Sequence, residues 1–471
     1  MDPGFRRPPA GLTVSLGRGE LARRIVHVGC VGFALLLRWL TWPEAALLAV
    51  AAFLFNWKVL PRVGGRGMWR GADVSRGFPL GILAYPLSVL GLILLFHDRL
   101  WMAAVGWGIL AVGDGMASLV GQAAGGPRLP WNARKGWAGF AAFVAFGASA
   151  AAFLAAWVGR LPLDPAAAHW AHTVGVGLSL AVVCALVESL PTTLDDNVTV
   201  PLAVALVLPL LAAAEPGLLL GDPLLARRLG VGLAANAAIA LPAYLARSVD
   251  ASGAASAVVI GTAITAGLGL PGLALMVAFF VLGTAATKLG YRRKAARGIA
   301  QEKGGARGWR HAWANGGVPA FLAVLAGMAL PGLRDLLGLA YAAAVATAAA
   351  DTCSSEVGKA YGRRTFLVTS LRPVPPGTEG AVSPEGTLGG FLGALAVGAA
   401  GVVAGLLTAP AALLVGVAGL LGSLAESVLG TVAERRGWMD NHLLNAANTA
   451  IGALVAVLIV SLLAAAKPLT R

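Results

Sequence analysis

Charged residues and cysteines are both scarce in this sequence. Lys, Arg, Asp and Glu make up only 12% of the 471 residues, whereas 58% of the residues are hydrophobic. The three cysteines, Cys30, Cys184 and Cys353, lie far apart, which argues against a zinc site and against a disulfide framework. The chain also lacks a Walker motif, a kinase glycine loop and a nucleophile elbow. These absences exclude an ordinary soluble kinase or hydrolase.

Long apolar runs recur from Ile25 to Ala466, each close to the roughly 20 residues that a membrane-spanning helix needs. They predict an all-α, polytopic integral membrane protein with about 15 transmembrane helices in two related bundles. The expected spans lie near residues 25–40, 44–60, 79–96, 101–121, 137–158, 172–190, 198–214, 229–247, 253–270, 272–290, 316–333, 336–351, 387–407, 409–428 and 446–466.

The net charge of +14 comes from Lys and Arg residues in short loops between the apolar runs. This distribution follows the positive-inside rule and gives no reason to expect a nucleic-acid partner. The loop at 291–310 carries seven Lys or Arg and a single acid, so its cations can also meet lipid head groups or a nucleotide. We expect a bacterial-type inner membrane or an organelle membrane. The N-terminus and the active-site loops would then lie on the cytoplasmic side, and the C-terminus outside.

The few acidic residues near span ends recur in the same order in the two halves. The segment GDGMASLVGQ contains Asp114, and ADTCSSEVGK contains Asp351. Asp114 precedes Glu188 by 74 residues, and Asp351 precedes Glu426 by 75. The first half then continues with Leu-Asp-Asp-Asn and the second with Met-Asp-Asn. This order indicates gene duplication, with domains at 1–228 and 229–471.

Carboxylates at the ends of several helices can converge on Mg²⁺, which prefers oxygen ligands and often binds substrate phosphates as well. Phosphoryl transfer also needs a cation for phosphate and glycines that open the backbone to it. The expected catalytic residues are Asp114, Lys135, Asp351 and Glu426. The expected nucleotide- and phosphate-binding residues are Gly113, Gly115, Lys135, Lys359, Arg363, Arg364, Arg372, Gly377, Thr378 and Gly380. The expected metal ligands are Asp114, Glu188, Asp195, Asp196, Asn197, Asp351, Glu356, Glu426, Asp440 and Asn441. An alternative is that these acids only cap helices or pair with loop arginines.

The first half resembles the dolichol kinase and phytol kinase family. The resemblance rests on RRIVHVG at 23–29, PLGILAYPLSVL at 79–90, GDGMASLVG at 113–121, NARKGWAG at 132–139 and LDDNVTVP at 194–201. It implies Mg²⁺-dependent transfer of phosphate from CTP to the hydroxyl of a polyprenol or phytol. Gly136 stands where that family usually has Thr or Ser, so a hydroxyl contribution at this position is not expected.

The second half resembles the membrane family that includes phytyl-phosphate kinase. The resemblance rests on DASGAASAVVIG at 250–261, RGWRHAWANGG at 307–317, ADTCSSEVGK at 350–359, PPGTEGAVSPEGT at 375–387 and DNHLLNAANT at 440–449. Cys353 stands where members often carry Trp, and Glu426 where they often carry Asp.

Together the two resemblances imply a natural fusion that makes an isoprenoid monophosphate and then the diphosphate. The expected partners are membrane lipids, an isoprenoid alcohol (phytol, geranylgeraniol or farnesol) and its monophosphate, and a nucleoside triphosphate. The sequence gives no oligomeric state. Two alternatives are a cytidylyltransferase that forms a CDP-lipid and a transporter built from duplicated bundles.

Overall fold

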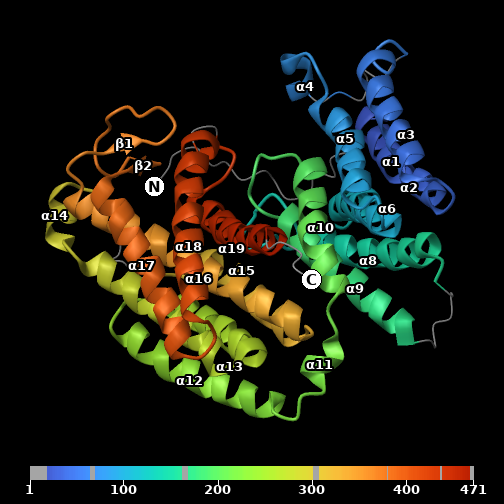
Figure 1. Ribbon diagram of the computed structural model, residues 1–471. Helices are drawn as coiled ribbons and strands as arrows, with labels where there is room; N and C mark the ends of the chain where they lie inside the picture. Colours follow the sequence, from blue (N-terminus) through green and yellow to red (C-terminus); the bar gives the residue numbers. More distant parts are fainter. Residues whose placement is uncertain are drawn as a thin grey trace. The chain divides into compact units, whose positions relative to one another are not determined.

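The computed structural model describes residues 18–63, 69, 71–161, 168–300, 307–378, 380–434 and 437–466. Within these residues the chain is helical, apart from one short β-hairpin and a few isolated bridges (Figure 1). The chain divides into two compact units, unit 1 at Met1–Ala212 and unit 2 at Ala213–Arg471. The predicted all-α, polytopic membrane fold is confirmed.

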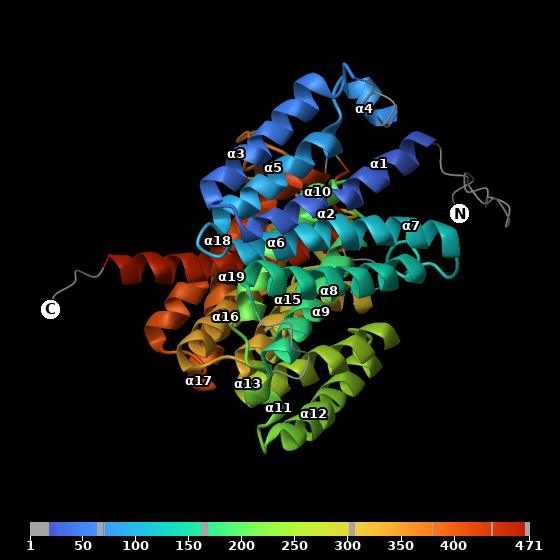
Figure 2. The same cartoon turned by 90° about the vertical axis from the view of Figure 1, so that its right-hand side faces the viewer.

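Unit 1 contains the elements that run from the N-terminal basic segment to the end of α10. They are α1 (Arg18–Gly29), α2 (Val31–Ala34), η1 (Leu35–Arg38), α3 (Trp42–Leu54), η2 (Phe55–Val59), α4 (Gly71–Arg76), α5 (Leu80–Leu95), α6 (Leu100–Gly108), η4 (Ile109–Asp114), α7 (Gly115–Ala124), α8 (Trp137–Gly159), α9 (Ala168–Glu188) and α10 (Asp196–Ala212). Here α8 packs against both α9 and the continuous α6–η4–α7 segment, as Figure 2 shows.

Unit 2 contains longer helices and the hairpin. Its elements are α11 (Pro216–Leu220), α12 (Leu225–Leu245), α13 (Ala251–Lys288), α14 (Tyr291–Ala296), α15 (Trp309–Gly327), α16 (Pro331–Tyr361), β1 (Phe366–Leu367), β2 (Ala381–Val382), α17 (Pro384–Val403), α18 (Ala409–Leu429), η6 (Gly430–Glu434) and α19 (Asn441–Ala465). The strands β1 and β2 are antiparallel, with Phe366 opposite Val382. The most deeply buried helix is α16, which packs against α13, α15, α17, α18 and α19.

Each predicted span is at least partly helical, but fewer helices than expected have the length of a membrane span. Among the described residues, nine helices are long and apolar enough to cross a membrane. Two predicted spans, 253–270 and 272–290, form the single helix α13, because Gly269 with φ 70° and Pro271 kink the helix without a loop. The helices α5 and α10 are apolar but shorter. α15 begins with a polar turn, and the first two predicted spans break into short segments.

The two units place corresponding elements around their acidic residues. In unit 1 the η4–α7 segment is followed by a loop and then by α8, α9 and α10. In unit 2 α16 is followed by the hairpin and then by α17, α18 and α19. Consecutive helices pack against one another in both sets. The order of elements therefore agrees with the order of acidic residues in the sequence.

A close glycine contact recurs in this arrangement. A Cβ on Gly139 of α8 would lie 3.5 Å from the Cα of Gly121, seven residues after the aspartate of unit 1. A Cβ on Gly386 of α17 would lie 3.2 Å from the Cα of Gly358, seven residues after the aspartate of unit 2. In both units the two helices therefore come close at a glycine that lies seven residues after the aspartate. Small residues allow such close approach in membrane helices.

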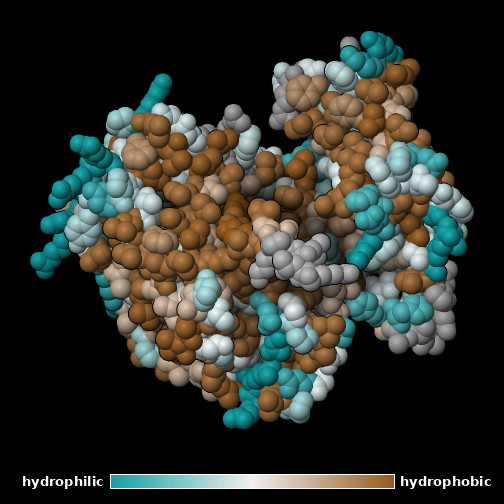
Figure 3. Space-filling model, in the orientation of Figure 1, coloured by the Kyte–Doolittle hydropathy of each residue, from teal (hydrophilic) through white to brown (hydrophobic). Residues whose placement is uncertain are grey.

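The surface agrees with a membrane location. Figure 3 shows apolar side chains over most of the visible face of unit 2, whereas hydrophilic side chains gather near α14 and the hairpin loop. Large apolar side chains such as Leu241, Leu388 and Leu458 are more than half exposed. A surface of this kind needs an apolar environment, and lipid provides it.

Candidate active sites

Three carboxylates converge in unit 1. Asp114 stands at the end of the π-helical turn η4, Glu188 ends α9 and Asp196 begins α10. One carboxylate oxygen from each lies within 4.8 Å of the other two. Asp114 is the most buried of the three, with 8% of its surface exposed. We call these three residues the acidic cluster.

The segment around Asp114 is fixed by the N-terminal helix α1. The Nε2–H of His27 donates a hydrogen bond of 2.9 Å to the carbonyl of Leu110, which lies within the π-helical turn. The same nitrogen lies 3.5 Å from Oδ2 of Asp114. The ring of Tyr85 meets the His27 ring edge-on at 4.7 Å. His27 therefore positions a predicted catalytic carboxylate, and π-helical turns are often found at functional sites.

The glycines beside Asp114 make room for hydrophobic neighbours. A Cβ on Gly113 would lie 3.0 Å from the ring of Phe143, a fully buried residue of α8. A Cβ on Gly115 would overlap the side chain of Val28 on α1. We expected both glycines to open the backbone to phosphate. In the structure they let α1 and α8 close over the π-helical turn, and Gly115 also lines a cavity.

Lys135 reaches the acidic cluster through a loop that docks on the end of α9. The side chains of Trp131 and Asn132 donate hydrogen bonds of 3.0 Å to the hydroxyl and the carbonyl of Ser189, respectively. The ammonium of Lys135 donates to the carboxylate of Glu188 and, at 2.5 Å, to its backbone carbonyl. A cation thus lies directly beside the cluster, where a phosphate group would need one.

The Asp-Asp-Asn segment closes the other side of the cluster. Oδ1 of Asp195 accepts hydrogen bonds from the backbone N–H of Asn197 at 3.0 Å and from its side-chain amide at 2.7 Å. Burial raises the pKa of Asp195, and the neighbouring charge of Asp196 raises it further. A Cβ on Gly81 would lie 3.0 Å from Oδ2 of Asp195, so this glycine lets α5 approach.

The donor set of unit 1 fits a hard divalent cation. Oδ1 of Asp114 and Oδ1 of Asn197 are buried and have no hydrogen-bond partner among the described residues. Both residues line a cavity of about 150 Å³. Crowded carboxylates repel one another unless a cation or protons neutralise them. Oxygen donors of this type are the ligands that Mg²⁺ prefers, so the residues fit the metal that the sequence implies.

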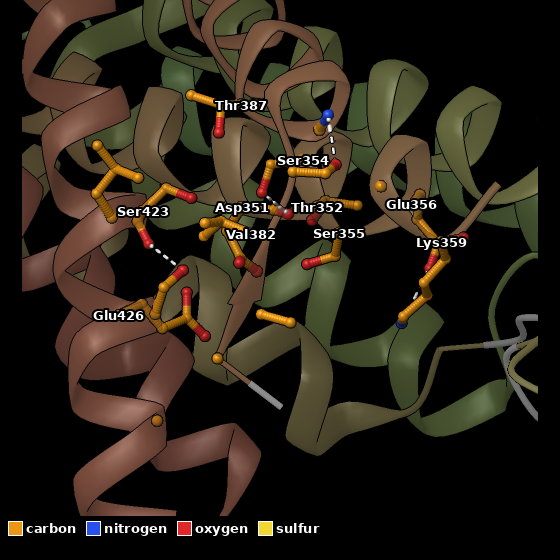
Figure 4. Close-up of a pocket in the computed structure, with 18 of the residues that line it drawn as sticks. Asp351, Thr352, Ser354, Ser355, Glu356, Lys359, Val382, Thr387, Ser423 and Glu426 are labelled. Carbon is orange, nitrogen blue, oxygen red and sulfur yellow. Dashed lines mark hydrogen bonds and ion pairs between the residues drawn. The ribbon is translucent and has the colours of Figure 1, made fainter. Parts of the chain in front are cut away.

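Unit 2 contains a larger polar cavity of about 330 Å³, lined by residues of α15, α16, α17, α18, the start of α19 and the hairpin loop (Figure 4). The predicted site residues that line it are Asp351, Glu356, Lys359, Gly377, Thr378, Gly380, Glu426 and Asn441. Gly380 adopts φ 70°, and a Cβ there would overlap Thr431 and lie 2.8 Å from the carbonyl of Ser427. The hairpin loop is thereby held closely against the end of α18.

Two carboxyl groups meet in this cavity. Asp351 of α16 and Glu426 of α18 are in hydrogen-bonding contact, and Ser355 also bonds to Asp351. The side-chain amide of Asn448 donates to Glu426. Asn441 is the first residue of α19, as Asp196 is of α10. An amide thus takes the place of the third carboxylate, and within the described residues the grouping of three acids occurs only in unit 1.

Glu356, a predicted metal ligand, forms a buried ion pair instead. It is 2% exposed, and its carboxylate accepts a hydrogen bond from Lys294 of α14, which is 1% exposed. Lys359 lies 3.6 Å from the other carboxylate oxygen. Two lysines therefore neutralise Glu356 beside the cavity. Lys294 was missed in the sequence because it stands in a basic loop and looks like a topology signal.

Four predicted residues lie outside the lining of the polar cavity. Arg363, Arg364 and Arg372 are exposed around the hairpin. Asp440 caps α19, and its Oδ1 accepts a hydrogen bond of 2.9 Å from the backbone N–H of Leu443. Ser383 was not predicted, although it caps α17 and lines the cavity. Its counterpart at the start of α8 is Gly136, so unit 1 has no hydroxyl at this position.

Residues 234–453 match a family described as "Integral membrane protein DUF92". The "Uncharacterized membrane protein sll0875" of Synechocystis sp. is 40% identical over 200 residues, which cover 42% of this chain and 78% of that protein. The chain belongs to this integral membrane family. No solved structure matches this chain.

Plant relatives connect the chain to phytol kinases. "Protein VTE6, chloroplastic" of Arabidopsis thaliana is 38% identical over 222 residues, which cover 45% of this chain and 66% of that protein. "Phytol kinase 1, chloroplastic" of the same plant is 32% identical over 131 residues, covering 27% of this chain and 41% of that protein. These matches support a phytol kinase-like relationship, although this chain spans less than half of the phytol kinase.

Proposed function

We propose that this protein uses CTP to phosphorylate an isoprenoid alcohol such as phytol, geranylgeraniol or farnesol in unit 1. Unit 2 then phosphorylates the product to give the diphosphate. The observation that carries the proposal is the acidic cluster, which lies beside the ammonium of Lys135 in a chain related to phytol kinases. A metal-binding group of acids next to a phosphate-binding cation is what phosphoryl transfer requires.

In unit 1, Asp114, Glu188 and Asp196 would hold Mg²⁺, which neutralises charge on the nucleotide phosphates when bound. Lys135 contributes a second positive charge, and His27 keeps Asp114 in place. The alcohol oxygen forms a bond to the terminal phosphorus of CTP, and the bond from that phosphorus to the bridging oxygen breaks. The hydroxyl proton passes to a carboxylate of the cluster. The products are the lipid monophosphate and CDP.

In unit 2 the acceptor is an oxygen of the lipid monophosphate. It forms a bond to the terminal phosphorus of a nucleoside triphosphate. The bond from that phosphorus to the bridging oxygen breaks, and the nucleoside diphosphate leaves. Asp351 and Glu426 lie in the polar cavity, and Lys359 lines its wall. The donor and acceptor phosphates both carry negative charge, so this step depends strongly on cations to bring the two together.

The position of the acids favours an enzyme over a transporter. A carrier of duplicated bundles holds its charged residues near the middle of the membrane. Here Asp114 lies inside the apolar segment Leu100–Ala124, but Glu188 ends α9 and Asp196 begins α10, so two of the three acids of the cluster stand at helix ends. Such a position gives access to a water-soluble nucleotide. A cytidylyltransferase would differ by its product, a CDP-lipid together with pyrophosphate.

The test uses purified protein with Mg²⁺, CTP and, in turn, phytol, geranylgeraniol and farnesol, and resolves the lipid products by mass. We expect monophosphate and then diphosphate from the wild type. Asp114→Asn should abolish the first step but convert supplied monophosphate to diphosphate, whereas Asp351→Asn should accumulate monophosphate. A wild-type protein that phosphorylates none of the three alcohols would refute the proposal, and a CDP-lipid would replace it with the cytidylyltransferase.

A further inference from the structure

In unit 2 the motif at 250–261 docks against the motif at 307–317. The backbone of Arg307 pairs with the segment before α13, with its N–H donating to the carbonyl of Ser248 and its carbonyl accepting from the N–H of Asp250, both at 3.1 Å. The N–H of Trp309 donates to the hydroxyl of Ser252 at 3.1 Å. A Cβ on Gly253 would overlap the Arg307 carbonyl. These contacts fix the position of Arg307.

The guanidinium of Arg307 has no carboxylate partner. Both terminal nitrogens lie 3.1 Å from the place that a Cβ on Gly283 of α13 would occupy, and one donates a weak hydrogen bond of 3.4 Å to the hydroxyl of Thr287. No acid of the described residues lies within ion-pairing distance of it, and Glu356 is already paired with two lysines. Burial lowers the pKa of Arg307. A partly buried cation without a counter-ion attracts an anion.

Arg307 and His311, with Asn236 and Asn315, are the polar residues that line an otherwise apolar cavity between α12, α13 and α15. The cavity has a volume of about 110 Å³. Its apolar lining includes Ile239, Ile260, Leu273, Met276, Phe279 and Phe280. A positive charge in the wall of an otherwise apolar cavity suits a ligand with an anionic head and a hydrocarbon chain.

His311 connects this cavity to the polar cavity of unit 2. It lines both, and its Nε2 is buried without a hydrogen-bond partner. The polar cavity contains Asp351 and Glu426. An anionic group held by His311 would therefore face the two carboxyl groups to which we assign the second phosphorylation.

We propose that Arg307 and His311 bind the phosphate of an isoprenoid monophosphate whose first chain segment occupies the apolar cavity. This inference rests on the proposed function, because it names the acceptor site of the second step. The planar guanidinium can bind two phosphate oxygens at once, and the unpartnered His311 nitrogen can donate to or accept from the phosphate. The site selects the monophosphate over the free alcohol through this charge.

The size of the cavity limits what it recognises. A cavity of about 150 Å³ can hold a benzene ring, and this one is smaller, at about 110 Å³. It therefore takes only the chain segment nearest the phosphate, and the rest of the chain extends into the bilayer. Geranyl, farnesyl and phytyl monophosphates should accordingly compete for the site with similar affinity.

The experiment measures binding of radiolabelled phytyl monophosphate to the full-length protein in nanodiscs, with nucleotide omitted. We expect Arg307→Gln to weaken binding about tenfold or more, as the loss of a charge-assisted bidentate contact does. Arg307→Lys should fall between this variant and the wild type. Arg310→Gln is the matched control, because Arg310 is exposed in the first turn of α15, three residues after Arg307, and its loss should leave binding unchanged. Binding of free phytol should be unaffected in every variant.

Equal binding of the monophosphate by Arg307→Gln and Arg310→Gln would overturn the inference. Thermal unfolding of the full chain in nanodiscs reports whether each variant is folded, and a variant with a lowered melting temperature is replaced by His311→Gln in the same assay. Binding that depends on Arg307 in a protein that makes no diphosphate would support the site and refute the proposed second reaction. Diphosphate formation by a protein whose binding is unchanged in Arg307→Gln would support the second reaction and refute the site.

Discussion

At the scale of single residues, the two sites differ most at the residue that begins the last helix of each set. Asp196 begins α10 and belongs to the acidic cluster, whereas Asn441 begins α19 and offers an amide. An amide oxygen is also a ligand for Mg²⁺, but it carries no charge. Unit 1 therefore concentrates more negative charge than unit 2, where Asp351 and Glu426 form a pair.

The variant Asp196→Asn gives unit 1 the residue that unit 2 has. We expect the Mg²⁺ concentration for half-maximal phosphorylation of phytol to rise about tenfold or more. Loss of a residue that only hydrogen-bonds to a metal ligand commonly lowers metal affinity about 10- to 100-fold, and Asp196 is proposed as a ligand itself. A Mg²⁺ titration of product formation measures this shift. Asn441→Gln, in the other unit, should leave the titration unchanged. An unaltered Mg²⁺ requirement in Asp196→Asn would remove Asp196 from the ligand set.

The rare charged residues were the part of the site that the sequence could indicate. Few acids stand in this mostly apolar chain, so the sequence could single them out. In the structure Asp114, Glu188 and Asp196 converge, and Lys135 reaches them. Sequence order could not reveal that a buried lysine neutralises Glu356. This pairing depends on how α14 folds back onto α16, which no local pattern encodes.

At the scale of elements, small residues decide how closely the helices around the second site approach. A Cβ on Gly390 of α17 would lie 2.7 Å from the carbonyl of Ala350 and 2.9 Å from the Cβ of Ser354. These two residues flank Asp351 on α16. The sequence contains 63 glycines, but the packing partner of each glycine emerges only from the folded chain. The kink of α13 likewise joined two runs that the pattern of apolar residues separated.

Gly390→Ala should push α17 away from α16 beside the second site. Forcing an extra methyl into packed helices typically costs about 1–3 kcal/mol, so we expect a lower melting temperature and loss of diphosphate formation, with monophosphate still made. Thermal unfolding and product analysis measure both effects. Gly332→Ala is the matched control on α16, since a Cβ there meets nothing within 4 Å. Equal behaviour of the two variants would contradict the packing argument.

At the scale of the whole molecule, one chain carries two sites whose proposed reactions share a lipid intermediate. Each unit has its own cavity and its own acids, and the described residues that line each cavity belong to that unit. An isoprenoid monophosphate partitions strongly into the membrane, at about 0.8 kcal/mol for each buried CH₂. The bilayer itself can therefore carry the intermediate from one site to the other, within a molecule or between molecules.

This argument predicts complementation between the two inactive variants. Asp114→Asn and Asp351→Asn, reconstituted together in the same vesicles with CTP and phytol, should restore diphosphate formation, because the monophosphate made by one variant diffuses through the shared bilayer to the other. The same variants in separate vesicles that are then mixed should accumulate monophosphate, since a long isoprenoid chain leaves a membrane slowly. Lipid products resolved by mass over time distinguish the two arrangements. Failure to complement in shared vesicles, with the wild type active, would mean that the intermediate passes only within one chain.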